Sequence, residues 1–528
     1  MEAAAPALPL PKSNVNPWVI AATAMLATFM EVLDTSVANV ALPHIAGDLS
    51  AGVDEATWVL TAYLVANAIV LPLSGWFSTL FGRKNFYMAC VAIFTVSSLM
   101  CGIAPSLNSL IFFRVMQGLG GGALQPVSQA IVVESFPKEK QGVAMAFYGM
   151  GVMVAPVIGP TLGGWITDNY SWRWIFLINI PVGVLSILFT TLLIKDPPYL
   201  VRKTFANGLK LDYIGLGLLS TGLAALEIML DEGQRDDWFG SNLIVTAAIL
   251  AVIGLVGAVV WELRQKDPII DFRILKSRNF ALAATMMYAL GFTLYGSTAI
   301  LPIFLQTVLG YTALLSGEVL SPGGFALMLG MLIVGRLMGK VEVRWLVIFG
   351  SVLASLGLYK MSKFNLTVDF NTAMIARTIQ AFGMAFLFVP INTTAFGSVA
   401  REKLGNASGL MNLFRNMGGS AGIATVNTIL ARRQQFHQQI LVSHLTPSDA
   451  GYAQAMQTTT AQIVSQGAST PDATAQAQGV LYNLMQKNAS MLAAADTFFV
   501  LALIFLALVP LAIFLKKAPP HQGPAVME

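Results

Sequence analysis

Long apolar runs, separated by short polar segments, recur along the whole chain. Fourteen of these runs approach the roughly 20 mostly apolar residues that a helix needs to cross the hydrocarbon core of a membrane. They lie near 18–40, 57–78, 86–104, 109–132, 142–166, 174–194, 212–230, 243–262, 280–304, 314–338, 345–361, 372–394, 407–430 and 492–515. The pattern predicts an all-α integral membrane protein with fourteen transmembrane helices.

Composition supports this class. Of the 528 residues, 55% are hydrophobic and only 11% are charged, against about 25% charged residues in a soluble protein. Cys90 and Cys101 lie on one apolar run, roughly 16 Å of helical rise apart, so no disulfide is expected between them. The histidines lack metal-ligand spacing. The sequence also has no phosphate-binding loop motif, so nothing in it points to an ATP-driven pump. We therefore expect no metal, no cofactor and no nucleic-acid partner.

The distribution of lysine and arginine predicts the orientation, because cytoplasmic loops are enriched in both. With the amino terminus placed in the cytoplasm, inside segments carry 21 of the 31 cations and outside loops carry 7. The other three, Arg114, Arg377 and Arg415, fall within predicted spans. Both termini are therefore predicted to be cytoplasmic.

An internal repeat divides the chain. Arg114-x-x-Gln117 matches Arg377-x-x-Gln380, and the segment 138–142 matches 401–405, both at an offset of 263 residues. Two matches at one offset predict two parallel six-helix halves with an inserted helix pair, the plan of the major facilitator fold. The predicted divisions are a cytoplasmic tail at 1–17, an N-terminal six-helix bundle at 18–194, two inserted helices with linkers at 195–279, a C-terminal six-helix bundle at 280–515 and a cytoplasmic tail at 516–528.

The second bundle includes a long outside loop at 431–491, which is polar and holds eleven glutamines. One interpretation is a disordered or short-helical loop. The other is a docking surface for a periplasmic partner.

Two acids interrupt the first span. Placing an Asp at the centre of a membrane helix costs about 2.5–3.5 kcal/mol of insertion free energy. Glu31 and Asp34 are therefore tolerated only if they face a water-filled cavity, contact a partner or are protonated. Because residues i and i+3 share a helix face, both acids point the same way. A structural hydrogen-bonded pair is one interpretation, and a functional ionisable site is the other.

Arg114 is the expected counter-charge, because it lies well inside its span and cannot lose its proton. Burial raises the pKa of a carboxyl group and a nearby cation lowers it, so an acid held between the two can exchange a proton when its surroundings change. This arrangement indicates a proton-coupled carrier. Arg377 and Arg415 are expected to be counterparts in the second half.

Glycines gather in the fifth span, at Gly159-Pro160-x-x-Gly163-Gly164. Glycines let membrane helices approach closely, so composition alone indicates only helix packing.

Together these residues resemble the 14-span drug:proton antiporters of the major facilitator superfamily, and among them the EmrB-type multidrug exporters. The resemblance covers nearly the whole chain. It is carried by Leu33-Asp34-Thr35-Ser36-Val37-Ala38-Asn39-Val40-Ala41-Leu42-Pro43, Arg114-x-x-Gln117-Gly118, the span-5 glycine motif and Trp172-Arg173-Trp174-Ile175-Phe176-x-x-Asn179-x-Pro181. Within the superfamily, the span-5 motif marks antiporters.

The resemblance implies a multidrug exporter in the bacterial inner membrane, driven by protons through Asp34, Glu31 and Arg114. It also implies hydrophobic substrates, a periplasmic adaptor of the EmrA type and an outer-membrane channel. We expect the substrate cavity to be lined by Glu31, Asp34, Asn39, Gln117, Gln125, Arg377, Gln380, Asn412 and Arg415. The expected gating loop contains Gly75, Gly82, Arg83 and Lys84.

The chain departs from the family pattern at three positions. Thr79 replaces a frequent aspartate, Ala155 replaces a usual glycine, and relatives often have glutamine in place of Glu31. Two other functions stay open: a same-fold exporter of a narrow substrate such as a fatty acid, siderophore or sugar, and a polytopic membrane enzyme. The second would need a clustered nucleophile and base, which the sequence does not show.

Overall fold

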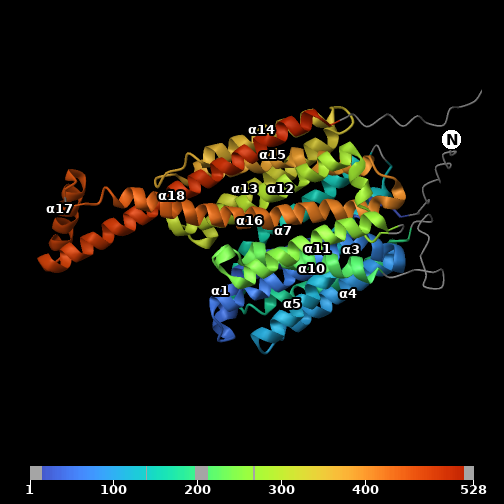
Figure 1. The fold of residues 1–528 in the computed structure, drawn as a ribbon, viewed down its shortest axis with the longest axis horizontal. Helices are drawn as coiled ribbons and strands as arrows, with labels where there is room; N and C mark the ends of the chain where they lie inside the picture. Colours follow the sequence, from blue (N-terminus) through green and yellow to red (C-terminus); the bar gives the residue numbers. More distant parts are fainter. Residues whose placement is uncertain (1–14, 138–139, 197–211, 266–267, 447, 516–528) are drawn as a thin grey trace, which may run out of the picture.

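The structure is a computed structural model that describes residues 15–137, 140–196, 212–265, 268–446 and 448–515. Over these ranges the chain is helical and contains no β-strand. The helices run side by side as an elongated bundle (Figure 1). The predicted tails at 1–17 and 516–528 and the linker after residue 196 lie wholly or largely outside the described residues.

The first half comprises α1 (Pro17–Asp48), α2 (Val53–Ala56), α3 (Trp58–Phe81), α4 (Arg83–Gly102), α5 (Leu107–Gly121), α6 (Leu124–Ser135), α7 (Gln141–Asn169), α8 (Trp174–Leu177) and α9 (Asn179–Leu193). The inserted segment contains α10 (Tyr213–Glu232), η3 (Trp238–Gly240), α11 (Asn242–Arg264) and η4 (Phe272–Lys276). The second half comprises α12 (Arg278–Ile303), η5 (Phe304–Val308), α13 (Ala313–Leu337), α14 (Val343–Met361), α15 (Phe370–Gly397), η6 (Arg401–Lys403), α16 (Leu404–Val442), α17 (Ala450–Ser465) and α18 (Thr470–Ile513).

A helix or a pair of helices occupies each of the fourteen predicted positions. Twelve helices in the described part of the chain are long and apolar enough to cross a membrane. The other two predicted spans coincide with α5 and α6, which are separate helices at 107–121 and 124–135, and with the less apolar α16. The number fourteen therefore stays a prediction, whereas the all-helical membrane fold is confirmed.

The repeat is visible in the helix boundaries. Helices α5 and α15 begin 263 residues apart, after caps in which Ser106 and Asp369 accept hydrogen bonds from backbone N–H groups of the first turn. Helices α7 and α16 also begin 263 residues apart. The two halves are thus built from equivalent helices, as the sequence repeat predicted.

The inserted helices pack on each other, and α10 also contacts α3 and α16. Carboxylates of α10 form hydrogen bonds to both halves. Asp231 accepts from Thr61 of α3, and Glu227 accepts from Ser420 of α16 at 2.7 Å. The inserted segment therefore lies across the junction of the halves rather than apart from them.

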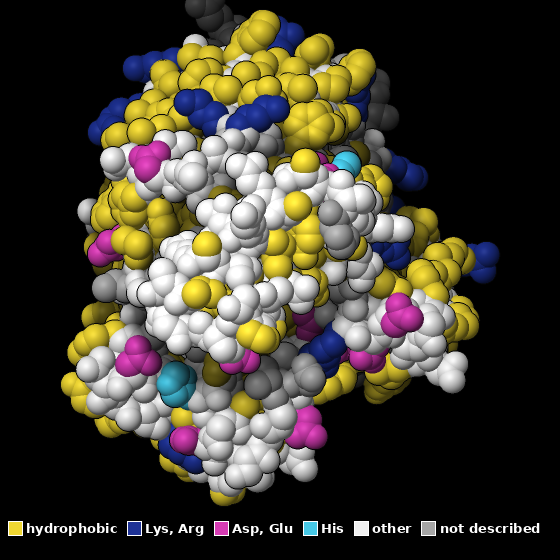
Figure 2. All heavy atoms as spheres, turned by 90° about the vertical axis from the view of Figure 1, so that its left-hand side faces the viewer, with side chains coloured by type: hydrophobic (Ala, Val, Ile, Leu, Met, Phe, Trp, Pro, Cys, Tyr) yellow, Lys and Arg dark blue, Asp and Glu magenta, His cyan; other side chains and the backbone are white. Residues whose placement is uncertain are grey.

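The segment predicted as an outside loop is helical. Helix α16 continues to Val442, α17 follows, and α18 starts at Thr470, so the segment projects beyond the bundle (Figure 1). Its base is tied by Asp496 of α18, which accepts from Arg433 Nε at 2.6 Å and lies 2.8 Å from His437 Nε2. Figure 2 looks onto this end, where white (uncharged polar side chains and backbone) predominates at the centre and hydrophobic side chains gather in the upper part of the view.

Candidate functional site

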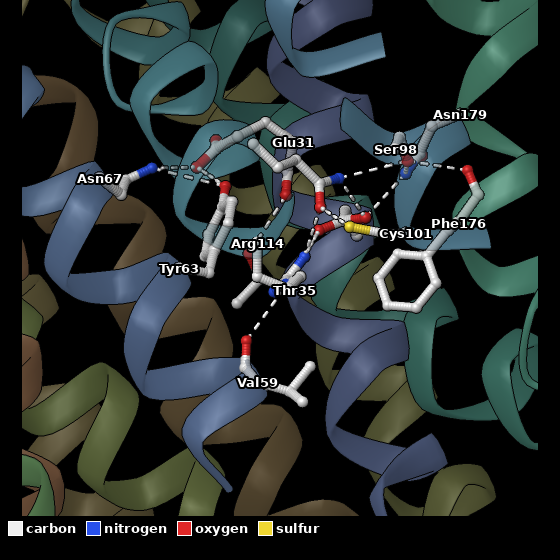
Figure 3. Close-up of polar contacts among 12 residues, drawn as sticks. Glu31, Thr35, Val59, Tyr63, Asn67, Ser98, Cys101, Arg114, Phe176 and Asn179 are labelled. Carbon is white, nitrogen blue, oxygen red and sulfur yellow. Dashed lines mark hydrogen bonds and ion pairs between the residues drawn. The ribbon is translucent and has the colours of Figure 1, made fainter. Parts of the chain in front are cut away.

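Asp34 is buried in a polar cluster formed with side chains of α5 and α9. Figure 3 shows this cluster around Arg114, Ser98 and Asn179. Arg114 Nη1 is 2.6 Å from Asp34 Oδ2. The other carboxylate oxygen, Oδ1, accepts from Gln117 Nε2 at 2.9 Å and from Asn179 Nδ2 at 2.7 Å. The predicted ion pair between Asp34 and Arg114 is present, and its carboxylate accepts a hydrogen bond on each oxygen.

Arg114 is held from several sides. Its side chain is 0% exposed, its Nε donates to the Val59 carbonyl at 3.0 Å, and its Nη1 donates to Gln117 Oε1 at 2.8 Å. The guanidinium carbon lies 4.2 Å from the centre of the Tyr63 ring. Such fixed contacts keep a cation in place where water cannot solvate it.

A second layer supports this pair. Ser98 accepts from Gln117 Nε2 at 3.2 Å and from Asn179 Nδ2 at 3.0 Å, and it donates to the Phe176 carbonyl at 2.8 Å (Figure 3). Ser98 and Asn179 were not among the predicted site residues. The resemblance motif contains Asn179, but nothing in the sequence of α4 indicated that Ser98 would face the same cluster.

Glu31 belongs to a neighbouring network. It accepts from Gln125 Nε2 at 2.7 Å, and its other oxygen lies 3.3 Å from both the Tyr63 hydroxyl and Asn67 Nδ2. Unlike Asp34, it has no cation in direct contact among the described residues. Tyr63 joins the two acids, because its ring faces Arg114 while its hydroxyl donates to Glu31.

Gln125 connects Glu31 to the second half of the molecule. Its amide nitrogen donates to Glu31, and its oxygen accepts from Arg415 Nη2 of α16. Glu31 thereby reaches a cation of the opposite half through one side chain. Both Gln125 and Arg415 were predicted cavity residues, but their contact was not foreseen.

Further polar contacts join α6 and α16. Gln129 Oε1 accepts from Asn412 Nδ2 at 2.8 Å and from Ser408 Oγ at 3.1 Å, and Ser408 Oγ also lies 2.8 Å from the Pro126 carbonyl. We refer to the contacts of Gln125, Pro126 and Gln129 with Ser408, Asn412 and Arg415 as the α6–α16 seam. Along this seam the two halves are closed against each other.

The remaining predicted cavity residues lie elsewhere. Arg377 Nη1 donates to Gln380 Oε1 at 2.8 Å within the second half. Asn39 has an exposed side chain that donates to the Thr35 carbonyl at 3.1 Å, so the structure does not bring it to either acid.

The span-5 motif packs α7 against α1. A Cβ atom added at Gly159 would meet Ser36 Oγ at 2.2 Å, and one at Gly163 would meet Val37 Cγ1 at 2.9 Å, whereas Gly164 is looser at 3.9 Å from Val40. Pro160 lies inside α7. Close approach to the helix that carries both acids is the physical reason for glycine at the first two positions.

The predicted gating loop lies where α3 and α4 meet. Gly82 has a φ angle of +82°, which favours glycine. Arg83 pairs with Glu134, and Lys84 donates through Nζ to the Thr191 carbonyl at 2.6 Å. Gly75 lies against α16, where an added Cβ would be 2.7 Å from Asn406 N.

Comparison with known proteins agrees with this architecture. The model of the family described as the Major Facilitator Superfamily matches residues 24–423. The multidrug export protein EmrB of Escherichia coli (strain K12) is 37% identical over 94% of this chain and 94% of its own. The fatty acid resistance protein FarB of Neisseria gonorrhoeae is 37% identical over 94% of this chain and 96% of its own.

A solved structure has the same overall fold. The crystal structure of the human organic anion transporter MFSD10 superposes with a TM-score of 0.62, covering 94% of this chain and 100% of that chain. At 13% sequence identity, this likeness shows the fold alone. The family match over residues 24–423 and the two relatives at 37% identity lead to one conclusion: the chain belongs to the Major Facilitator Superfamily.

Proposed function

We propose that this chain is a proton-coupled multidrug efflux antiporter, which exports hydrophobic and amphipathic compounds by alternating access from the bacterial inner membrane. The observation that supports this most directly is the buried contact between Asp34 and Arg114, whose side chains are 1% and 0% exposed. Intramembrane ion pairs of this kind are costly and are typical of ion pathways. The multidrug export proteins among the relatives support the substrate class.

Asp34 is the proposed coupling acid. With its carboxylate ionised, Arg114, Gln117 and Asn179 satisfy it, and a proton on Asp34 would remove the charge that holds Arg114 in place. Loss of one partner from a buried pair leaves an uncompensated charge, which costs about 3–5 kcal/mol. Protonation would therefore favour a different arrangement of α1 and α5.

Glu31 provides a route from proton binding to the movement of the halves. Its ionised carboxylate orients Gln125, whose oxygen then faces Arg415 across the α6–α16 seam. A neutral Glu31 would hold Gln125 less firmly, because charge-assisted hydrogen bonds are roughly twice as strong as neutral ones. We propose that this loosens the seam and lets the halves separate on that side.

The proton gradient supplies enough free energy for this cycle. One charge crossing 100 mV releases about 2.3 kcal/mol, and one pH unit adds about 1.4 kcal/mol. A single proton could thus support a substrate gradient of roughly 500-fold.

Reconstitution tests the proposal. The purified protein in proteoliposomes with an imposed pH gradient should accumulate several chemically unrelated hydrophobic compounds, and collapse of the gradient should abolish accumulation. Accumulation that ignores the gradient would refute proton coupling.

A narrower exporter is the second candidate, because a relative named for fatty acid resistance is as similar as the multidrug exporters. Transport assays in the same proteoliposomes distinguish the multidrug exporter from the narrow exporter. Transport of medium-chain fatty acids alone, with no movement of cationic or neutral dyes, would favour the narrow exporter.

Partners form a separate part of the proposal. We propose that α17 and the projecting ends of α16 and α18 contact a periplasmic adaptor of the EmrA type, which joins the transporter to an outer-membrane channel. Their outward projection supports this. A photocrosslinker at Tyr452 should capture the adaptor when both are co-expressed, and one at Lys84 should not.

A further inference from the structure

The second half contains a partial copy of the Asp34 site that lacks the acid. Arg114, Gln117 and Asp34 have counterparts 263 residues later, at Arg377, Gln380 and Ser297. The contacts repeat as well. Arg377 Nη1 donates to Gln380 Oε1 at 2.8 Å, as Arg114 Nη1 does to Gln117 Oε1 at 2.8 Å. Gln380 Nε2 donates to Ser297 Oγ at 2.8 Å, as Gln117 Nε2 does to Asp34 Oδ1 at 2.9 Å.

The carboxylate is the missing group. Where Asp34 lies 2.6 Å from Arg114, Ser297 Oγ lies 3.4 Å from Arg377 Nη1, and Arg377 Nη2 donates to Thr298 Oγ1 at 3.3 Å. Helices α12 and α15 contain no aspartate or glutamate. Among the described residues no acid lies within ion-pair distance of Arg377, so its charge is unneutralised by the chain.

Arg377 lies within its helix rather than at the helix end. Arg377 lies seven residues beyond Phe370, the first residue of α15, which is about 10 Å of helical rise. Its aliphatic stem packs over Gly323 of α13, where an added Cβ would be 3.1 Å from Arg377 Cγ. Arg377 is partly exposed, whereas Arg114 is fully buried. The second copy therefore presents an accessible cation with a planar fork of donors.

We infer that Arg377, Gln380, Ser297 and Thr298 form a binding site for the carboxylate of an amphipathic organic anion, which occupies the place that Asp34 fills in the first half. A guanidinium binds a carboxylate through two parallel hydrogen bonds, and the side-chain amide of Gln380 is already placed as Gln117 is beside Asp34. This inference rests on the proposed export function and names one class of its substrates.

Matched probes test the site. Laurate and dodecyltrimethylammonium have tails of equal length and opposite charge, and their dissociation constants can be measured by calorimetry on the full-length protein in amphipol. Ser297→Asp supplies the missing carboxylate from within, so the preference for laurate over dodecyltrimethylammonium should fall about tenfold or more. Ser297→Asn introduces a side chain of the same size as aspartate but without charge. This control should keep the preference for laurate within about threefold of the wild-type value.

The arginine is tested separately. Arg377→Gln should lose the preference as Ser297→Asp does, and Arg377→Lys should keep part of it because the charge remains. Gel filtration and thermal unfolding confirm that each variant is folded. An unchanged preference in both Ser297→Asp and Arg377→Gln would overturn the site.

Two further outcomes separate the alternatives. If soluble dihexanoyl phosphatidylglycerol displaces laurate from wild-type protein in an Arg377-dependent way and binds more tightly, the site holds a lipid phosphate and the substrate assignment is wrong. Binding is measured without transport, so Arg377-dependent laurate binding in a chain that exports nothing would refute the export function and leave this site standing.

Discussion

At the residue scale, two acids on one face of α1 have different surroundings. Asp34 contacts a permanent cation at 2.6 Å, whereas Glu31 is bound by neutral donors. A carboxylate paired with arginine responds to protonation by losing an ion pair, and one bound by amides loses only the charge assistance of its hydrogen bonds. The two acids are therefore expected to have separable roles.

Asp34→Asn is expected to abolish proton-driven export and to leave substrate binding measurable. Asparagine keeps the size and polarity of aspartate but cannot titrate, so binding should also lose most of its pH dependence. Drug accumulation by the variant in proteoliposomes with an imposed pH gradient is the measurement. Accumulation at the wild-type level would remove Asp34 from the coupling mechanism.

Glu31→Gln is expected to retain transport but to shift preference away from cationic compounds. The substitution keeps an acceptor for Tyr63 and Asn67 and removes the negative charge next to Gln125. Transport of a cationic and a neutral dye in the same vesicles measures the ratio, which should fall about threefold to tenfold for the cation. If this variant is inactive and Asp34→Asn is active, the two roles must be exchanged.

Arg114→Ala is expected to lose all transport, and Arg114→Lys to keep part of it. Removing the guanidinium leaves Asp34 buried without its counter-charge, which costs about 3–5 kcal/mol of stability unless the acid takes up a proton. Lysine restores the charge but not the fork that reaches Asp34, Gln117 and the Val59 carbonyl. Transport rates at matched expression test this, and full activity of the alanine variant would contradict it.

Part of this site could be predicted from sequence, and part could not. A buried acid needs a cation, and so few charges lie within spans that Arg114 was identifiable as the partner of Asp34. Ser98 and Tyr63 carry no such signal, because serine and tyrosine are common in membrane helices and only the packing of α3 and α4 shows which way they face. The bridge from Glu31 through Gln125 to Arg415 depends on how the two halves meet, which no local pattern encodes.

At the scale of helices, close approach of α3 and α16 closes one side of the molecule. A Cβ at Gly75 would be 2.7 Å from Asn406 N and 2.8 Å from Gly405 C, which are backbone atoms that cannot turn aside. Any larger residue must push the two helices apart. Gly47 of α1 has nothing within 4 Å of an added Cβ and provides a matched control.

Gly75→Val is therefore expected to open the α6–α16 seam. A cysteine placed at Ser408, which is 0% exposed, should react slowly with a maleimide in the parent and at least about tenfold faster with Gly75→Val. Gly47→Val should leave the rate unchanged. Equal rates in all three proteins would show that this approach does not control the seam.

Helices also show where sequence patterns fell short. The 431–491 segment was predicted to be polar and outside, with a disordered or short-helical loop as one interpretation. No helix was placed in it, since a search for apolar runs cannot find a polar helix. Glutamine and alanine favour helices, and both are frequent in α17 and in the first turns of α18. The composition of this segment contained the signal, but its hydrophobic pattern did not.

At the scale of the whole molecule, the internal repeat predicted more of the fold than any single motif did. The 263-residue offset fixed which helices are equivalent, and the helix boundaries at α5 and α15 and at α7 and α16 reproduce it. The same offset identifies Ser297 as the counterpart of Asp34 and Leu294 as the counterpart of Glu31, so neither acid of the first half is repeated in the second. How the inserted helix α10 bridges α3 and α16 could not be read from the sequence, because hydroxyl partners such as Thr61 and Ser420 are found only through packing.

Orientation in the membrane gives the last prediction. Lysine and arginine are concentrated in segments that include 195–211, of which 197–211 lies outside the described residues, while α17 belongs to the cation-poor side. Both native cysteines, Cys90 and Cys101, are buried, so single cysteines can be introduced with little background labelling. A membrane-impermeant maleimide added from the periplasm should label Thr458→Cys in α17 and spare Lys203→Cys until the membrane is permeabilised. The reverse pattern would overturn the predicted orientation. Labelling of both in intact cells would mean that an even number of spans separates the two positions, whereas the fourteen-span arrangement places seven predicted spans between them.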